Sequence, residues 1–378
     1  MTDGVSERPA DGPRIPDYAG PCVTGLVPAL LGPGGTGALP AWFPDPARGA
    51  RSVVLFVVDG LGWEQLRARP GLAPTLDSMT GRPIDAVAPT TTATSLTSIV
   101  TGLTPGEHGV VGYRVAMHGE ILNVLRWTTP AGDARKRIDP HDFQHHRAFL
   151  GEKVPVVGRR EFEGSGFTRA HMDGTRIVGY RMPSSIPIEV RQLVESGERF
   201  VYAYYDGVDK VAHEYGFGPH YDAEVAAADR LVADVLAAVP ADTVVLVTAD
   251  HGQVQVGPAI LDPPAPVLAG VRFQSGEGRF RWYHTRPGAQ GDVQAAATDA
   301  FGSVAWIVSI EQVLDERWLG AYVSDAARIR LGDVAVVARE PVSFADPADT
   351  GPIELICRHG SLTPDEVLVP LLCARGAA

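Results

Sequence analysis

The sequence predicts an α/β fold in which a doubly wound, mostly parallel sheet carries helices on both faces, with a small inserted α+β lobe. Three continuous apolar runs have the length of a strand, and each is followed by an acidic turn and a helix-like stretch. Such runs are typical of strands buried on both faces of a parallel sheet, and their alternation with helices is typical of doubly wound folds. The rhythm breaks after residue 260, which predicts the lobe.

Composition narrows the function classes. The chain has 378 residues, of which 45% are hydrophobic and 21% charged, enough apolar material for one large core. Its net charge of -12 argues against a nucleic-acid polymer or an anionic membrane as partner. No apolar run reaches the length of a membrane span, and nothing in the sequence indicates an oligomeric state.

The cysteines and the N-terminus predict a cytoplasmic location. Three cysteines without a CxxC pattern suggest a reducing compartment rather than a disulfide framework: Cys22, Cys357 and Cys373. Residues 1–20 are polar and proline-rich, carry no signal-peptide pattern, and are expected to form a loosely ordered arm.

The first predicted strand is Ser52–Asp59, SVVLFVVD. It ends in an aspartate followed by a glycine turn and the helix-like segment WEQLRAR. This order places Asp59 at the carboxyl edge of the sheet, where open α/β sheets bind their ligands.

The segment Val87–Gly109 is predicted to hold a short apolar helix over about 93–101, with Gly102 just past its end. Thr92 then lies at or next to the N-cap. Its hydroxyl and the free N–H groups of the helix start could serve as a cap or as part of an anion site. Taken alone, this pattern favours the cap.

The middle of the chain is less regular. Val115–Trp127 is predicted to form a hairpin around His118 and Gly119, and residues 154–181 contain short strands. His171 and Asp173 are interpreted as ordinary loop residues. The histidines of the polar stretch 129–147 have no supporting carboxylate pattern and are not expected to bind metal: His141, His145 and His146.

Two further strands end in possible ligands. Arg199–Asp206 leads into DKVAH, where Asp209 and His213 are four residues apart and share one face of a helical turn. Thr243–Ala249 runs directly into Asp250 and His251, with an amphipathic helix expected before it.

The remaining segments give the predicted domain organisation. Residues 261–347 should form the lobe, with strands around RFRWYHT and SVAWIVS and helices around DVQAAATDAFG and IEQVLDERWLG. The chain then returns through Ile353–Cys357 to His359 and ends in a core strand, VLVPLLCA. Residues 21–260 and 348–378 would make up the α/β core.

Several strands thus end in carboxylates and imidazoles, a ligand mix that suits Zn²⁺ or Mn²⁺. Six such residues are too many for one tetrahedral ion and suit two: Asp59, Asp209, His213, Asp250, His251 and His359. Two adjacent metals can hold the attacking and leaving oxygens of a phosphoryl displacement, and a nearby hydroxyl can act as nucleophile.

The motifs VVDGLG, PTTTATSLTSIVTGLTPGEHG, DKVAHEYG, TADHG and RHG, in this order, resemble the alkaline phosphatase superfamily. The most similar branch is the type I phosphodiesterase / nucleotide pyrophosphatase family, over about residues 53–359. The resemblance implies an alkaline phosphatase-like core and a hydrolase of small phosphate esters or nucleotides.

The resemblance also implies roles for individual residues. Thr92 would be the nucleophile and form a phosphothreonine intermediate that water hydrolyses. One metal, most simply Zn²⁺, would bind Asp59, Asp250, His251 and the Thr92 oxygen, and the other Asp209, His213 and His359. Spacing favours Thr92 over its rivals Thr90, Thr91 and Thr94.

Two departures from the family pattern concern the substrate. Tyr113 stands four residues after Gly109, where the phosphodiesterases usually have an asparagine that donates to a phosphate oxygen. Tyr113 is therefore the candidate substrate-binding residue. The stretch YYDGVD replaces the family's Glu-x-Pro-Asp.

Other functions are compatible with parts of this sequence pattern. The chain lacks a sulfatase CxPxR motif, and a phosphoglycerate mutase would use serine and a much larger insert. A phosphomonoesterase or a phosphonate-cleaving hydrolase uses the same bimetal core; a monoesterase would need additional cations, for which Arg114, Arg126 and Arg181 are candidates. A non-catalytic nucleotide-binding pseudoenzyme would have lost a ligand, whereas all seven positions are intact.

Overall fold

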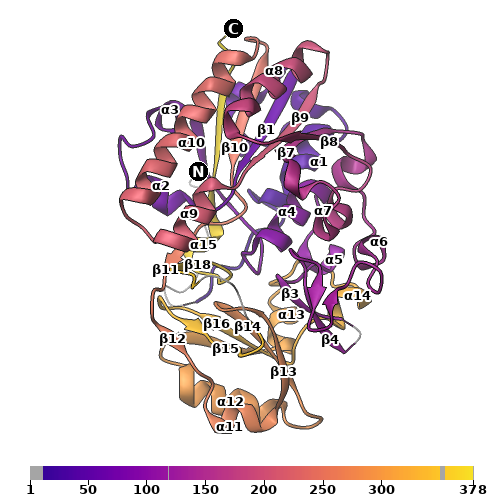
Figure 1. The fold of residues 1–378 in the computed structure, drawn as a ribbon, viewed down its shortest axis with the longest axis vertical. Coiled ribbons are helices and arrows are strands. Elements are labelled where there is room, and N and C mark those ends of the chain that lie inside the picture. Colours follow the sequence, from indigo (N-terminus) through magenta and orange to yellow (C-terminus); the bar gives the residue numbers. More distant parts are fainter. Residues whose placement is uncertain (1–11, 118, 350–353, 378) are drawn as a thin grey trace, which may run out of the picture.

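A computed structural model describes residues 12–117, 119–349 and 354–377. Its centre is a seven-stranded sheet of order β2-β19-β10-β1-β9-β7-β8 (Figure 1). The strands are β1 Ser52–Val58, β2 Thr80–Asp85, β7 Pro155–Arg159, β8 Arg176–Tyr180, β9 Phe200–Tyr205, β10 Thr243–Thr248 and β19 Leu368–Arg375.

The sheet is mostly parallel, as the apolar runs predict. β10, β1, β9, β7 and β8 are parallel to one another, and every residue of β1 and β10 is buried. β19 is the exception, because it pairs antiparallel with both β10 and β2. β2 was not expected as a strand: its sequence TGRPID is polar and contains a proline, which an edge strand tolerates.

Helices cover both faces of this sheet. On one side α10 contacts α8, α9 and α3, and on the other side α4 contacts α1 and α7 (Figure 1). The helices of the core are α1 Leu26–Leu31, α2 Trp63–Arg67, α3 Pro74–Ser78, α4 Thr92–Thr101, α5 Pro105–His108, α6 Pro140–Phe143, α7 Gly166–His171, α8 Ile186–Glu195, α9 Gly207–Tyr215, α10 Pro219–Ala238 and α15 Pro364–Val367.

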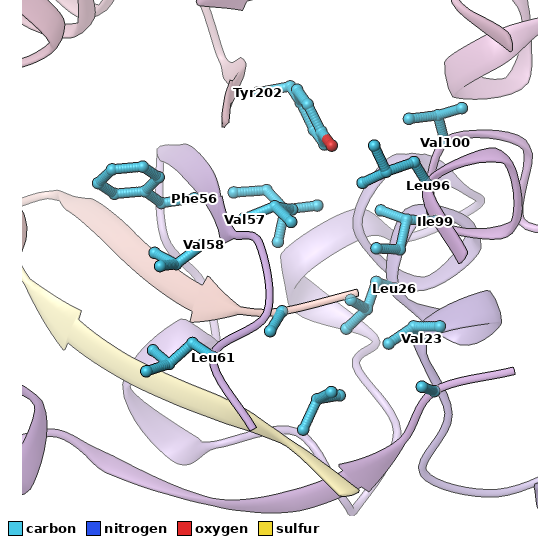
Figure 2. Close-up of a cluster of buried hydrophobic side chains, with 14 of the residues drawn as sticks. Val23, Leu26, Phe56, Val57, Val58, Leu61, Leu96, Ile99, Val100 and Tyr202 are labelled. Carbon is cyan, nitrogen blue, oxygen red and sulfur yellow. The ribbon is translucent and has the colours of Figure 1, made fainter. Parts of the chain in front are cut away.

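α4 packs its apolar side onto the sheet. Leu96, Ile99 and Val100 are buried, and Figure 2 shows them on the side where Val57 and Tyr202 project. The helix begins at Thr92, one residue earlier than expected, and ends at Gly102 with a φ of 71°. The expected inner face of this helix is therefore correct.

A second sheet of order β13-β14-β16-β15 lies below the first in Figure 1. This sheet lies in the part of the chain after residue 260, where the regular alternation of strands and helices ends in the sequence. Its strands β13 and β16 were not expected. Its elements are α11 Ala265–Gly270, β13 Val271–Glu277, β14 Phe280–Thr285, α12 Gln290–Phe301, β15 Ala305–Ser309, α13 Ile310–Asp315, α14 Asp325–Arg328 and β16 Val334–Ala338.

The second sheet has two apolar faces because its strands alternate. Tyr283 and Val336 pack with α11 and α12 in a separate cluster, whereas Trp282 and Val337 belong to the main core. We therefore propose the boundaries at 261 and 347 as those of a lobe that shares one face with the core.

Short elements complete the chain. The predicted hairpin is present as β3 and β4, while His118 at its turn lies outside the described residues. The short strands are β3 Arg114–Met117, β4 Glu120–Asn123, β5 Thr128–Thr129, β6 Gly132–Asp133, β11 Val254–Gln255, β12 Ile260–Leu261, β17 Ser343–Phe344 and β18 Cys357–Arg358. The 3-10 helices are η1 Val23–Gly25, η2 Gly35–Gly37, η3 Asp45–Ala47, η4 Ala148–Gly151, η5 Arg160–Phe162 and η6 Pro183–Ser185.

Residues 12–20 belong to the arm that was expected to be loosely ordered, but they form hydrogen bonds to the rest of the protein. Arg14 Nε donates to Asp85 Oδ1 at 2.9 Å, and the Tyr18 hydroxyl donates to the Trp318 carbonyl at 2.7 Å. These contacts join residues 12–20 to β2 and to the segment between α13 and α14, and composition does not reveal them because their partners are distant in sequence. Residues 1–11 lie outside the described part.

Within the described ranges, no helix is long and apolar enough to cross a membrane. The three cysteines are buried as free thiols.

Candidate metal centre

The candidate site forms at the carboxyl edge of three adjacent strands. In the parallel registers, Val57 lies opposite Thr248 and Val58 opposite Tyr205, so β10, β1 and β9 end side by side. Asp59 follows β1 directly, Asp209 lies in the first turn of α9 after β9, and Asp250 follows β10. The topology therefore brings together carboxylates that are up to 191 positions apart in the sequence.

One group consists of Asp59, Asp250, His251 and Thr92. Nε2 of His251 lies 3.4 Å from Asp250 Oδ2, 3.6 Å from Asp59 Oδ1 and 3.1 Å from Thr92 Oγ1. Asp59 Oδ1 and Asp250 Oδ2 are buried and have no hydrogen-bond partner. Buried carboxylate oxygens without partners are costly, and a cation between them would satisfy both.

The second group consists of Asp209, His213 and His359. Asp209 Oδ1 lies 3.3 Å from His213 Nε2 and 3.9 Å from His359 Nε2. His359 also stacks on His251 with ring centroids 3.5 Å apart, so the two groups adjoin. By atom spacing, the candidate metal clusters are Asp59–Asp250–His251 and Asp209–His251–His359, with His251 common to both.

The three histidines are oriented alike. Nδ1 of each donates to a main-chain carbonyl oxygen: Cys357 for His213 (2.7 Å), Gly252 for His251 (3.0 Å) and Thr90 for His359 (2.8 Å). A carbonyl oxygen only accepts, so in each neutral ring Nδ1 carries the proton and Nε2 keeps its lone pair. This is the arrangement in which imidazole binds a metal.

Burial shifts the pKa values of several side chains in this cluster. Burial raises the pKa of Asp59 well above its usual value, and the neighbouring Asp250 and Asp209 raise it further. Burial likewise raises the pKa of Asp209 and Asp250, and lowers the pKa of His251 and His359. Three close carboxylates and neutral imidazoles form a site that a divalent cation would stabilise, so the residues present fit such an ion.

An outer layer of donors holds the carboxylates, and the sequence did not reveal it. The Tyr204 hydroxyl donates to Asp59 Oδ2, and Gln253 Nε2 donates to Asp209 Oδ1 at 2.8 Å. The main-chain N–H groups of Gly60 and His251 both donate to Asp250 Oδ1 at 3.1 Å. The position of Tyr204 near the end of β9, just before the acidic turn, is the feature of the sequence that could have predicted this contact.

Exposure separates Thr92 from its rivals. Thr92 is partly exposed and lines a cavity together with Asp59 and Asp209. Thr91 and Thr94 are buried, and Thr90 Oγ1 donates to the Ser361 carbonyl at 2.7 Å and accepts from the Gly360 N–H at 3.0 Å. Thr92 is therefore the accessible hydroxyl of the four.

The structure does not bring Tyr113 to this cavity. Its hydroxyl donates to Asp349, and the adjacent Arg114 pairs with Asp346, so both side chains belong to a network with residues that follow the second sheet. The Tyr113 hydroxyl therefore donates to Asp349 rather than to a phosphate oxygen. Tyr113 as a substrate donor stays a prediction that would require this bond to break.

The other candidates also lie apart from the cluster. Arg126 and Arg181 are exposed, and the rings of His145 and His146 lie with centroids 4.3 Å apart and planes tilted by 31°. The cations that line the cavity are Arg159 and Lys210, which the sequence analysis missed. Both pair with Asp206, at 2.6 Å and 2.5 Å.

The cavity beside Thr92 has a volume of about 250 Å³ and largely apolar walls. It lies between α4, α7 and β9. Its lining comprises Asp59, Thr92, Leu96, Leu125, Val156, Gly158, Arg159, Phe162, Glu163, Ser165, Phe167, Thr168, His171, Met172, Ile177, Tyr202, Tyr204, Asp206, Asp209 and Lys210.

Comparison with known proteins places this site in context. The family model of type I phosphodiesterase / nucleotide pyrophosphatase matches residues 53–361. No curated protein matches the sequence significantly.

Several solved structures share the fold. Murine ectonucleotide pyrophosphatase / phosphodiesterase 5 superposes with a TM-score of 0.64 at 15% identity, covering 86% of this chain and 88% of that one. An inactive threonine-to-alanine form of the murine protein, in complex with AMP, gives 0.64 at 14% identity over 85% and 87%. Phosphonoacetate hydrolase from Sinorhizobium meliloti 1021, in complex with phosphonoformate, gives 0.62 at 17% identity over 87% and 91%.

Proposed function

Because the chain belongs to the type I phosphodiesterase / nucleotide pyrophosphatase family of hydrolases, we propose that it is a bimetal-dependent phosphodiesterase or nucleotide pyrophosphatase that acts through a phosphothreonine intermediate. One observation carries the proposal. The Thr92 hydroxyl lines an apolar cavity and lies 3.1 Å from Nε2 of His251, which also adjoins two buried carboxylate oxygens without partners.

Two divalent cations would be held by this chain's own residues. Asp59, Asp250, His251 and Thr92 would hold one, and Asp209, His213 and His359 the other. The mixed nitrogen and oxygen donors favour Zn²⁺, with Mn²⁺ as the alternative. When bound, the cations would neutralise the charge that develops on the transferring phosphoryl group.

The protein residues account for the remaining chemistry. The Thr92 oxygen forms a bond to phosphorus while the bond from phosphorus to the leaving oxygen breaks, and the Thr92 proton passes to solvent. A water molecule then cleaves the phosphothreonine and restores the hydroxyl. Tyr204 and Gln253 keep Asp59 and Asp209 oriented during both steps.

The cavity supports an organic phosphodiester as substrate. Its apolar walls next to Thr92 suit the uncharged organic group of a diester or nucleotide. The AMP complex of the murine relative agrees with this substrate class. We also retain the sequence-based predictions of a cytoplasmic location and of a small-molecule partner rather than a nucleic-acid polymer.

A phosphonate-cleaving activity is the second candidate, because of the similarity to phosphonoacetate hydrolase. A carboxylate-bearing substrate would need a free cation beside the site. Arg159 and Lys210 both pair with Asp206, which favours the phosphodiester.

The test is a substrate panel on protein that has been stripped with a chelator and reloaded with Zn²⁺ or Mn²⁺. We expect bis(4-nitrophenyl) phosphate to be hydrolysed faster than 4-nitrophenyl phosphate or phosphonoacetate, with no activity before reloading. Elemental analysis should give two metals per chain. Full activity with less than one metal per chain would refute the two-metal model, and faster release of phosphate from phosphonoacetate would favour the second candidate.

A further inference from the structure

The cavity beside Thr92 contains polar groups that the proposed reaction does not use. We propose that His171, at the end of α7, determines specificity by accepting a hydrogen bond from an N–H or O–H group on a flat aromatic or heteroaromatic substituent of the substrate. This inference rests on the proposed function and names the class of substituent that the cavity takes.

His171 is held in one tautomer. Its Nδ1 donates to the Phe167 carbonyl at 2.6 Å, and its ring stacks on that of Phe167 with centroids 3.8 Å apart. Nδ1 therefore carries the proton, and Nε2 is an acceptor. Burial lowers the pKa of His171 to about 4, so the ring stays neutral at physiological pH.

The acceptor of His171 is free in the described chain. The side chain is 4% exposed and lines the cavity, and no hydrogen bond from a described residue reaches Nε2. Nε2 is not one of the buried side-chain atoms that lack a partner, so it keeps some accessible surface, and a ligand that supplies a donor there is favoured over a ligand that does not.

Tyr202 provides a second polar group in the same wall. Its side chain is fully buried and its hydroxyl has no partner, whereas the hydroxyl of Tyr204 is occupied by Asp59. Figure 2 shows the Tyr202 hydroxyl directed toward Leu96 of α4, another residue of the lining. The same wall thus contains the acceptor of His171 and, behind it, a buried hydroxyl without a partner.

The shape of the cavity defines the substituent. A volume of about 250 Å³ suits one ring system rather than a dinucleotide. Phe162 and Phe167 line it, and aromatic walls favour flat groups that stack. An aminated heterocycle meets both conditions, because it stacks and also donates a hydrogen bond.

The experiment compares two probes that differ by one donor. These are the 4-nitrophenyl esters of adenosine 5′-phosphate and of purine riboside 5′-phosphate, which lacks the exocyclic amine. Wild-type protein loaded with Zn²⁺ should prefer the adenosine ester by about tenfold in kcat/KM, mostly through KM. In His171→Phe, which keeps the ring stack, the preference should disappear because kcat/KM for the adenosine ester falls to that for the purine riboside ester.

Two more variants complete the design. His171→Gln, which restores an acceptor near Nε2, should recover part of the preference, and His145→Phe, at an exposed histidine outside the cavity, should leave it intact. Thermal melting shows whether each variant is folded. If His171→Phe does not fold, the wild-type preference and the His171→Gln result decide.

The failures of the two proposals are distinguishable. Equal kcat/KM for both esters in the wild type, or a preference that survives His171→Phe, would overturn the role of His171. Turnover of bis(4-nitrophenyl) phosphate, which has no donor, reports on the proposed function alone. Its absence from metal-loaded wild type would refute that function instead.

Discussion

At the scale of single residues, the site depends on side chains whose donors and acceptors are already committed. Nδ1 of each histidine in the cluster donates a hydrogen bond to a main-chain carbonyl oxygen. Asp59 accepts a hydrogen bond from Tyr204, and Asp209 accepts one from Gln253. The Nε2 atoms of the histidines therefore lie close to the carboxylate oxygens, with their lone pairs available to a cation. Such preorganisation lowers the cost of binding a cation.

Thr92→Ala should reduce phosphodiesterase turnover by about a thousandfold or more while both metals stay bound, because the Asp and His ligands remain. Thr91→Ala is the matched control, since the Thr91 hydroxyl is buried and has no partner. Steady-state kinetics and elemental analysis of both variants make the measurement. Near-normal turnover by Thr92→Ala would show that the nucleophile lies elsewhere.

Asp59→Asn should stabilise the metal-free protein at neutral pH. The pKa of Asp59 is raised in the fold by burial, then by Asp250 and Asp209, so the stability linked to its protonation is complete below about pH 4 and is lost as pH rises through the folded pKa. Asparagine carries no charge and avoids that loss. The melting temperature of the metal-free variant should exceed that of metal-free wild type at pH 7, and the difference should shrink toward pH 4.

Calorimetry of chelator-treated protein between pH 4 and pH 8 measures this effect. Asp262→Asn, at an exposed position, should behave like the wild type at each pH. If metal-free wild type is the more stable protein at pH 7, the mutual repulsion of the buried carboxylates is not significant.

At the scale of elements, α4 is the helix that presents the nucleophile. It begins at Thr92, packs Leu96 and Ile99 on the sheet, and ends at Gly102, whose positive φ of 71° allows the chain to turn. A Cβ at Gly102 would lie 2.5 Å from Pro28 Cγ. The end of α4 is therefore fixed by both conformation and packing.

Gly102→Ala should destabilise the protein by about 2 kcal/mol or more, because the left-handed conformation and the overlap with Pro28 both add cost. Gly174→Ala separates the two terms: its φ is +81° but a Cβ there meets nothing within 4 Å, so about 1 kcal/mol is expected. Urea unfolding of the two variants tests this order. An equal loss in both would mean that Pro28 simply moves aside.

At the scale of the whole molecule, a buried ion pair joins the turn between β13 and β14 to α15. Arg279, just before β14, donates through Nε and Nη2 to Glu366 of α15 at 2.8 Å and 2.8 Å, and both side chains are fully buried. Glu366 also accepts from the Ser361 N–H, two residues after His359. The same carboxylate therefore links the second sheet to the segment that carries a candidate ligand.

Arg279→Met should cost about 3–5 kcal/mol, because it leaves Glu366 buried without its counter-charge. The double variant Arg279→Met/Glu366→Leu should recover much of this loss, since it removes the orphaned charge as well. Chemical unfolding of the single and double variants measures the difference. A single variant as stable as wild type would show that solvent or a rearranged side chain compensates Glu366.

The sequence alone determined the local parts of this protein. The strands β1, β9 and β10 consist mainly of apolar residues, and the acidic turns that follow them carry Asp59, Asp209 and Asp250. These signals are contiguous in the chain, so periodicity, turn residues and motif order are sufficient to identify them. The α/β class, the helix after Val87 and the family resemblance follow from the same signals, and the family match confirms the resemblance.

Tertiary structure decided what depends on distant partners. The antiparallel direction of β19, the pairing of β2, the seating of residues 12–20 and the Arg279–Glu366 bond all join segments remote in sequence. The roles of Tyr204, Gln253 and His171, and the engagement of Tyr113 by Asp349, are of the same kind. A hydroxyl or an imidazole has the same identity wherever it stands in the chain. Its donors, acceptors and exposure are set only when the fold places other residues against it.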